Sequence, residues 1–136
     1  MTKKQREAVY SKYNGHCAYC GKEIKYKDMQ VDHLIPQRRA TLYGRGHVSI
    51  DEIETEENFM PSCRSCNLHK RANCLETYRR YVEEIPMKLT RDNYIYKIGL
   101  RYDLIEEHPR KIKFYFEQVE EASSTWEQHK KQEQLL

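Results

Sequence analysis

The chain has 136 residues, of which 33% are charged, and a formal net charge of only +3. This length fits one domain with a modest core. No apolar run approaches the roughly 20 residues that a membrane-spanning helix needs, and the first residues lack the apolar stretch of a signal peptide. We therefore expect a cytoplasmic protein and exclude a membrane protein.

Charge is distributed unevenly along the chain. Residues 1–50 contain ten Lys and Arg against four Asp and Glu, and residues 61–80 contain five against one, whereas residues 51–60 contain five acids and no base. Two basic segments suit a polyanionic partner such as nucleic acid. Chance clustering on a solvated surface is the alternative, and charge alone does not decide between them.

In the first half of the chain, local patterns predict short elements. Residues 3–13 read as an amphipathic helix that Asn14-Gly15 closes. Residues 17–36 read as a cysteine knuckle followed by a β-hairpin with its turn near Lys27-Asp28. Residues 37–57 read as a long polar loop with one helical turn.

In the second half, apolar residues recur at helical spacing over 64–84, and Pro86 ends that helix. A second helix is expected over 92–106. The alternation in 111–119 favours a strand, with a helix as the alternative. We expect residues 1–85 to form the core domain, 86–119 an extension that packs on it, and 120–136 a flexible tail or frayed helix.

The five cysteines form two Cys-x-x-Cys pairs and one single residue. The pairs are Cys17 with Cys20 and Cys63 with Cys66, separated by 42 residues. Each pair offers two thiolates from one tight turn, which is typical of a tetrahedral zinc site. Disulfides or a redox pair are the rivals, but they lack an oxidising compartment or a thioredoxin-like pattern. We expect structural Zn²⁺ at these four residues, and a buried, apolar role for Cys74.

Asp32 and His33 stand in the apolar stretch "MQVDHLIPQ", where buried charge is costly unless it is paired or holds a metal. Neighbours on a strand point to opposite faces, so one of them can face a metal and the other a water. A carboxylate and an amide or imidazole can hold a divalent ion, and an imidazole can activate water, so phosphodiester hydrolysis is feasible. The alternatives are a structural histidine and a salt-bridged aspartate.

The combined motif resembles the zinc-knuckle branch of the HNH endonucleases, the ββα-metal nucleases. The likeness covers about residues 16–71 and depends on four groups of residues: Cys17-x2-Cys20, Val31-Asp32-His33-x2-Pro36, Asn58 and Cys63-x2-Cys66-Asn67-x2-Lys70. It implies a small ββα core, which the four-cysteine zinc site would staple. Together with the flanking helices and the C-terminal strand that the local patterns favour, we expect an α+β fold.

The resemblance also implies roles for individual residues. His33 matches the general base, and Asn58 the residue that ties down the loop behind the base. Asp32 matches a ligand of the catalytic Mg²⁺ or Mn²⁺. Asn67 matches the second ligand, with His69 as its rival because imidazole binds transition metals well.

DNA is the partner that the resemblance implies, with cleavage leaving 5′-phosphate and 3′-hydroxyl ends. The 24 residues between His33 and Asn58 carry further candidate phosphate contacts, and others follow the second cysteine pair. These basic candidates are Arg38, Arg39, Arg45, Lys70 and Arg71. Whether the protein is a monomer or a homodimer stays open.

Two other classes of function stay open. One is a zinc-stapled module that binds nucleic acid without catalysis, for which the basic segments would suffice. The other is a protein-interaction domain in which zinc is only a staple. The nucleic-acid-binding module leaves the Asp32-His33 pair and Asn58 unexplained.

Overall fold

A computed structural model describes residues 1–37 and 49–134, with side chains as far as residue 124. The chain divides into two compact units. The first contains Met1–Cys74 with Lys113–Leu136, and the second contains Leu75–Ile112.

The first unit combines helices with a small sheet and so has an α+β fold. In chain order its elements are α1 (Lys3–Ser11), η1 (Tyr26–Asp28), β1 (Gln30–His33), α3 (Ile50–Ile53), η2 (Glu56–Asn58), β2 (Phe59–Ser62), α4 (Arg64–Lys70) and α8 (Tyr115–Gln134).

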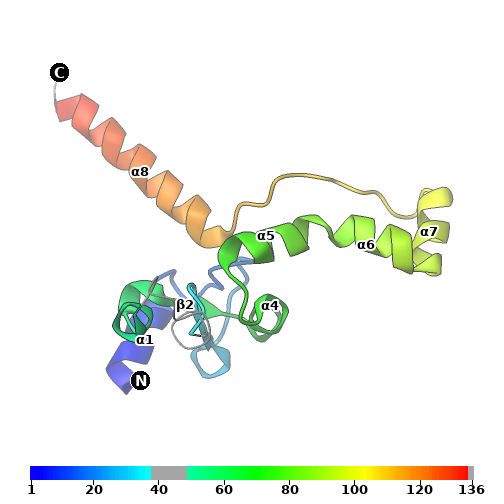
Figure 1. The fold of residues 1–136 in the computed structure, drawn as a ribbon. Helices are drawn as coiled ribbons and strands as arrows, with labels where there is room; N and C mark the ends of the chain where they lie inside the picture. Colours follow the sequence, from blue (N-terminus) through cyan, green and yellow to red (C-terminus); the bar gives the residue numbers. More distant parts are fainter. Residues whose placement is uncertain (38–48, 135–136) are drawn as a thin grey trace. The chain divides into compact units, whose positions relative to one another are not determined.

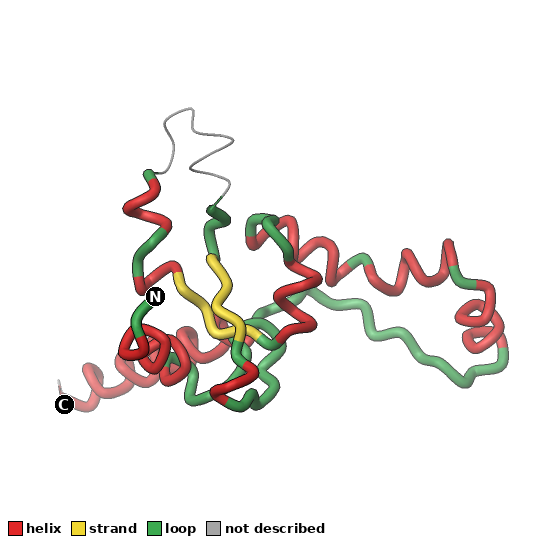
Figure 2. The backbone as a smooth tube through the Cα atoms, turned by 90° about the horizontal axis from the view of Figure 1, so that it is seen from below, coloured by secondary structure: helices red, strands yellow, loops and turns green. Residues whose placement is uncertain are grey.

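The sheet consists of β1 and β2, which pair antiparallel with Gln30 opposite Ser62 and His33 opposite Phe59 (Figure 2). The expected hairpin within residues 17–36 is therefore wrong. Residues 26–28 form a 3₁₀ turn. The strand that pairs with β1 is β2, which begins at Phe59, after the segment between His33 and Asn58. A local turn pattern in the sequence does not reveal pairing between strands that lie far apart in the chain.

The predicted first helix is confirmed, although it is shorter than expected. Thr2 and Gln5 form a reciprocal capping box at its start. After Ser11 the chain turns through Asn14 and Gly15, which have φ values of 52° and 76°. Val9 is buried on the inner face of the helix.

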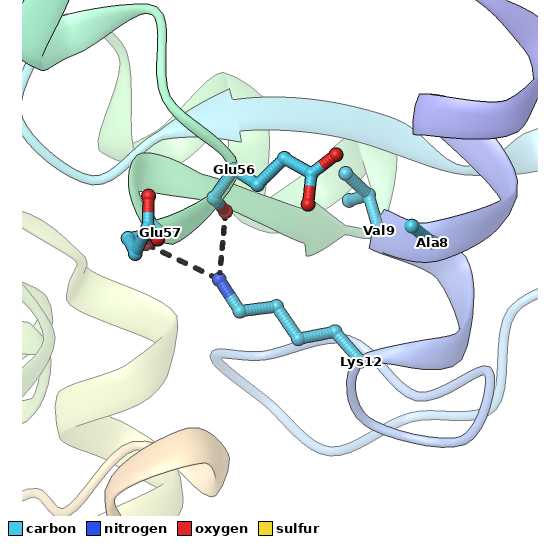
Figure 3. A pocket seen from close by; sticks show the side chains of 5 residues that line it. All are labelled: Ala8, Val9, Lys12, Glu56 and Glu57. Carbon is cyan, nitrogen blue, oxygen red and sulfur yellow. Dashed lines mark hydrogen bonds between the residues drawn. The ribbon is translucent and has the colours of Figure 1, made fainter.

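Lys12 joins the end of α1 to the start of β2. Its ammonium group donates to the backbone carbonyls of Glu56 and Glu57 at 3.1 and 3.2 Å (Figure 3), and to that of Phe59 at 3.0 Å. Burial lowers the pKa of Lys12, and the nearby glutamates oppose this shift.

The predicted single helix over 64–84 is wrong, because α4 ends at Lys70 and α5 (Leu75–Glu83) begins after a break. Arg71 has a φ of 53°, which lies outside the right-handed helical region and stops the helix. Asn73 Nδ2 then donates to the carbonyl of Lys70, one of the last carbonyls of α4, at 3.0 Å.

The expected strand over 111–119 is also wrong. The backbone N–H of Phe114 donates to the Glu117 carboxylate, and α8 begins at Tyr115. Phe114 and Phe116 are both buried, in edge-to-face contact with Tyr19. The backbone N–H groups of Tyr115 and Phe116 donate to the carbonyls of Tyr19 and Ala18, so the start of α8 is part of the first unit's core.

The second unit contains α5, α6 (Ile85–Asp92) and α7 (Tyr94–Arg101), followed by an extended segment that returns toward α5 (Figure 1). The helix expected over 92–106 is thus shorter, because Asn93 caps its start and Asp103 has a φ of 54°. Arg79 and Glu83 on α5 bond the backbone of Ile112. Among the helices described, none has the length and apolar character to cross a membrane.

Candidate active site and metal centre

The four paired cysteines converge on one point. Their sulfur atoms all lie within 4.8 Å of one another, and Cys20 Sγ lies 3.9 Å from Cys63 Sγ. Four thiolates at about 2.3 Å from a tetrahedral zinc would lie about 3.8 Å apart. The five cysteines, which all lie in the described part of the chain, form no disulfide. The donor set and its spacing therefore fit zinc.

The local backbone structure around each cysteine pair positions the sulfur atoms of this four-cysteine cluster (Cys17, Cys20, Cys63 and Cys66). Cys63 is the N-cap of α4, and its sulfur accepts from the backbone N–H of Cys66 at 3.4 Å. A hydrogen bond from Cys66 lowers the pKa of Cys17 to about 4. Gly21 has a φ of 78°, and an added Cβ would lie 2.9 Å from the Tyr115 ring, so the turn after Cys20 requires glycine.

Asp32 is buried and held from two sides. Its Oδ2 accepts from the hydroxyl of Tyr19 at 2.5 Å and from the ammonium of Lys70 at 2.9 Å. Its Oδ1 has no hydrogen-bond partner within residues 1–37 and 49–124. Tyr19 stands between the two cysteines of the first knuckle, so this bond links the four-cysteine cluster to Asp32.

His33 is half-buried at the end of β1. Its Nε2 lies 2.9 Å from Oε1 of Glu54, and its ring contacts the Phe59 ring edge-on with centroids 5.3 Å apart. The same Glu54 oxygen accepts from Gln37 Nε2 at 2.7 Å. No described residue forms a hydrogen bond to His33 Nδ1.

Asn58 fixes the chain behind His33. Its side chain accepts from the backbone N–H of Ile35 at 2.7 Å and donates to the carbonyls of Ile35 and Ile53 at 3.0 and 2.9 Å. Its backbone carbonyl also accepts from Leu34. A single buried amide therefore joins the residues after β1 to α3.

A pocket of about 370 Å³ brings together several of the residues singled out in the sequence. Its described lining is Asp32, His33, Pro36, Gln37, Asn67, Arg71 and Ala72.

Asn67 and His69 occupy different positions on α4. Asn67 lines the pocket, and its side chain has no hydrogen-bond partner in the described part of the chain. His69 is exposed and is not among the described lining residues.

The basic candidates differ in position. Lys70, expected to contact nucleic acid, has no exposed surface, and its ammonium bonds the Asp32 carboxylate and the His33 carbonyl. Arg71 lines the pocket, and no described residue pairs with its guanidinium. Arg38, Arg39 and Arg45 lie outside the described residues.

A second pocket, of about 220 Å³, is lined by Ala8, Val9, Lys12, Glu56 and Glu57 (Figure 3). Its lysine is already bonded to three backbone carbonyls. It shares no described residue with the pocket at His33, which is therefore the better candidate for chemistry.

Sequence reasoning missed three residues of the site. Glu54 is one of five acids in residues 51–60, and nothing in the local pattern separates it from the other four. Tyr19 resembles any core aromatic, and Gln37 any loop residue. Their proximity to Asp32 and His33 depends on the fold, so the sequence held no signal for them.

Residues 17–73 match the family model described as HNH endonuclease. This match confirms, for residues 17–73, the resemblance to the HNH endonucleases that the sequence motif indicated. Among solved structures, the crystal structure of the Type II-C Cas9 enzyme from Actinomyces naeslundii is similar, with 24% sequence identity and a TM-score of 0.44. The likeness covers 57% of this chain and 7% of the Cas9 chain. No curated protein matches the chain.

Proposed function

We propose that the protein is a metal-dependent endonuclease that hydrolyses phosphodiester bonds in DNA. A nuclease-type function follows from the HNH domain. The observation that carries the finer proposal is the single pocket that combines an imidazole, a buried carboxylate and an amide without a described partner: His33, Asp32 and Asn67.

His33 acts as the general base. With Nε2 bonded to Glu54, its Nδ1 is the nitrogen left to take a proton from water, and the ring lines the pocket that would admit the substrate. Asn58 holds the residues that follow His33, which keeps the imidazole at the pocket wall.

Asp32 and Asn67 would hold the catalytic cation, Mg²⁺ or Mn²⁺. Asp32 is buried, and its Oδ1 has no described partner. This oxygen and the Asn67 amide oxygen are the hard oxygen donors that such ions prefer. When bound, the ion neutralises charge on the phosphate and on the leaving oxygen. Lys70 and Tyr19 hold the other Asp32 oxygen and so fix the carboxylate. Asn67 remains preferred over His69, which lies outside the described lining of the pocket.

Zn²⁺ in the four-cysteine cluster has a structural role in this proposal. Cys17, Cys20, Cys63 and Cys66 would hold the ion, which would stabilise the junction between the first knuckle and the start of α4 that carries Asn67. Thiolate ligands suit a reducing compartment, so we propose a cytoplasmic location.

DNA is the proposed substrate. Arg71 offers a guanidinium to a phosphate at the pocket, and Arg38, Arg39 and Arg45 are proposed as further phosphate contacts. Lys70 supports the site from the protein interior through its ion pair with Asp32, and it does not contact DNA.

The test is a nicking assay on supercoiled plasmid with Mg²⁺ or Mn²⁺. We expect the wild type to nick, and His33→Ala to lose about 10²–10⁴-fold in rate. The control is His108→Ala, since His108 is exposed and lies in the second unit. Full activity in His33→Ala would refute the catalytic assignment. Salt-dependent DNA binding without cleavage in any divalent metal would instead favour a non-catalytic nucleic-acid-binding module.

A further inference from the structure

Glu54 lies at the end of α3 with its carboxylate on the imidazole of His33. Its Oε1 accepts from Nε2 of His33 at 2.9 Å and from Nε2 of Gln37 at 2.7 Å. Within residues 1–37 and 49–124, no other carboxylate bonds this ring.

The chain holds Glu54 in place from both sides. Ser49 caps α3, and the fully buried Ile53 precedes Glu54. The carbonyl of Ile53 accepts from Asn58, the residue that also bonds Ile35. The backbone that carries Glu54 is therefore tied to the backbone that follows His33.

The chemistry of this contact selects one tautomer of His33. The hydrogen bond from Gln37, followed by the charge and hydrogen bond of His33, lowers the pKa of Glu54, so this group is a carboxylate at neutral pH. A carboxylate can only accept hydrogen bonds, so the ring hydrogen must be on Nε2. The lone pair is then on Nδ1, for which the described residues supply no partner.

We propose that Glu54 is a positioning residue for the general base: its carboxylate fixes the ring of His33 and keeps its hydrogen on Nε2, so that Nδ1 faces the attacking water. This inference rests on the proposed nuclease function. It assigns to the acidic segment 51–60 a role that its composition does not indicate, and it makes Gln37 the residue that orients Glu54.

The test compares Glu54→Gln with Glu52→Gln in the full, zinc-loaded chain. Glu52 is an exposed acid on the same short helix, two residues away, and no described contact of its side chain involves His33. An amide at position 54 can donate to Nε2, which favours the opposite tautomer. The readouts are the ¹⁵N chemical shifts of the His33 ring and the nicking kinetics, with zinc content and melting temperature as checks on folding.

We expect Glu54→Gln to lose the Nε2–H form and to lower kcat by about 10–100-fold, the usual effect of removing such a supporting partner. KM should stay within about twofold because no substrate contact is removed. Glu52→Gln should match the wild type in every readout.

An unchanged tautomer together with an unchanged kcat in Glu54→Gln would overturn the proposal. If the wild type cleaves no DNA in any metal, the nuclease function fails, and the NMR result alone decides the role of Glu54. In that case loss of the Nε2–H form still supports positioning, whereas its retention refutes it.

Discussion

Lys70 offers a sharp test of how the interior of the site is held. Its side chain is fully buried, and its ammonium lies 2.9 Å from Asp32 Oδ2 and 3.1 Å from the His33 carbonyl. Lys70→Met keeps most of the aliphatic volume and removes the charge. The Asp32 carboxylate is then left buried with Tyr19 as its remaining described partner.

The magnitude follows from the burial of both partners. Removing one member of a buried ion pair costs about 3–5 kcal/mol, because the other charge stays uncompensated. At ~5 °C for each kcal/mol in a domain of this size, the melting temperature should fall by about 15–25 °C. Circular dichroism with saturating zinc measures this change, and urea titration measures the free energy of unfolding. The control is Lys3→Met, which removes an exposed pair with Glu7 and should cost at most about 0.5 kcal/mol.

A loss below about 1 kcal/mol in Lys70→Met would refute this reasoning. The double variant Lys70→Met/Asp32→Asn adds a second check. Because it removes both charges, it should be more stable than the sum of the single effects by about 1–3 kcal/mol. Strict additivity would mean that the two groups do not interact.

Two further predictions concern the zinc site and Asn58. Cys63→Ser should lower the zinc content below one ion per chain and destabilise the first unit, whereas Cys74→Ser, outside the four-cysteine cluster, should keep its zinc. Elemental analysis measures the zinc content of both variants. Unchanged zinc in Cys63→Ser would contradict the assignment. Asn58→Ala removes three hydrogen bonds to the backbone of Ile35 and Ile53, so urea titration should show a loss of about 2–4 kcal/mol. A loss under about 0.5 kcal/mol would mean that this amide does not hold the loop.

The convergence of the cysteines could be predicted from the sequence because each pair is local. Two residues between cysteines place both sulfurs on one turn, and four thiolates in a small domain favour a shared metal. The Asp32–His33 pair stood out because charge in an apolar strand needs a reason. These features depend on spacing and residue type, which a single sequence contains.

The remaining features depend on contacts between distant segments. The partner strand of β1 begins at Phe59, and Phe114 and Phe116 return to the aromatic core beside Tyr19. The alternation around Phe116 looked like a strand, but the side chain of Glu117 caps a helix that begins there. Tertiary contacts overrode local propensity in each case.

The buried contacts of the site could not be predicted from the sequence for the same reason. Lys70 reads as a surface residue in a basic segment, yet it is buried against Asp32, 38 positions earlier in the chain. Glu54 reads as one acid among several, yet it bonds His33. A pattern of charges does not reveal which charge the fold will pair.

The most direct test of the central claim is the single-turnover rate of plasmid nicking by His33→Gly, measured with and without added imidazole. If His33 is the general base, the variant should lose about 10²–10⁴-fold in rate, and imidazole that enters the pocket should restore part of it. A rate in His33→Gly equal to that of the wild type, with no response to imidazole, would contradict the account.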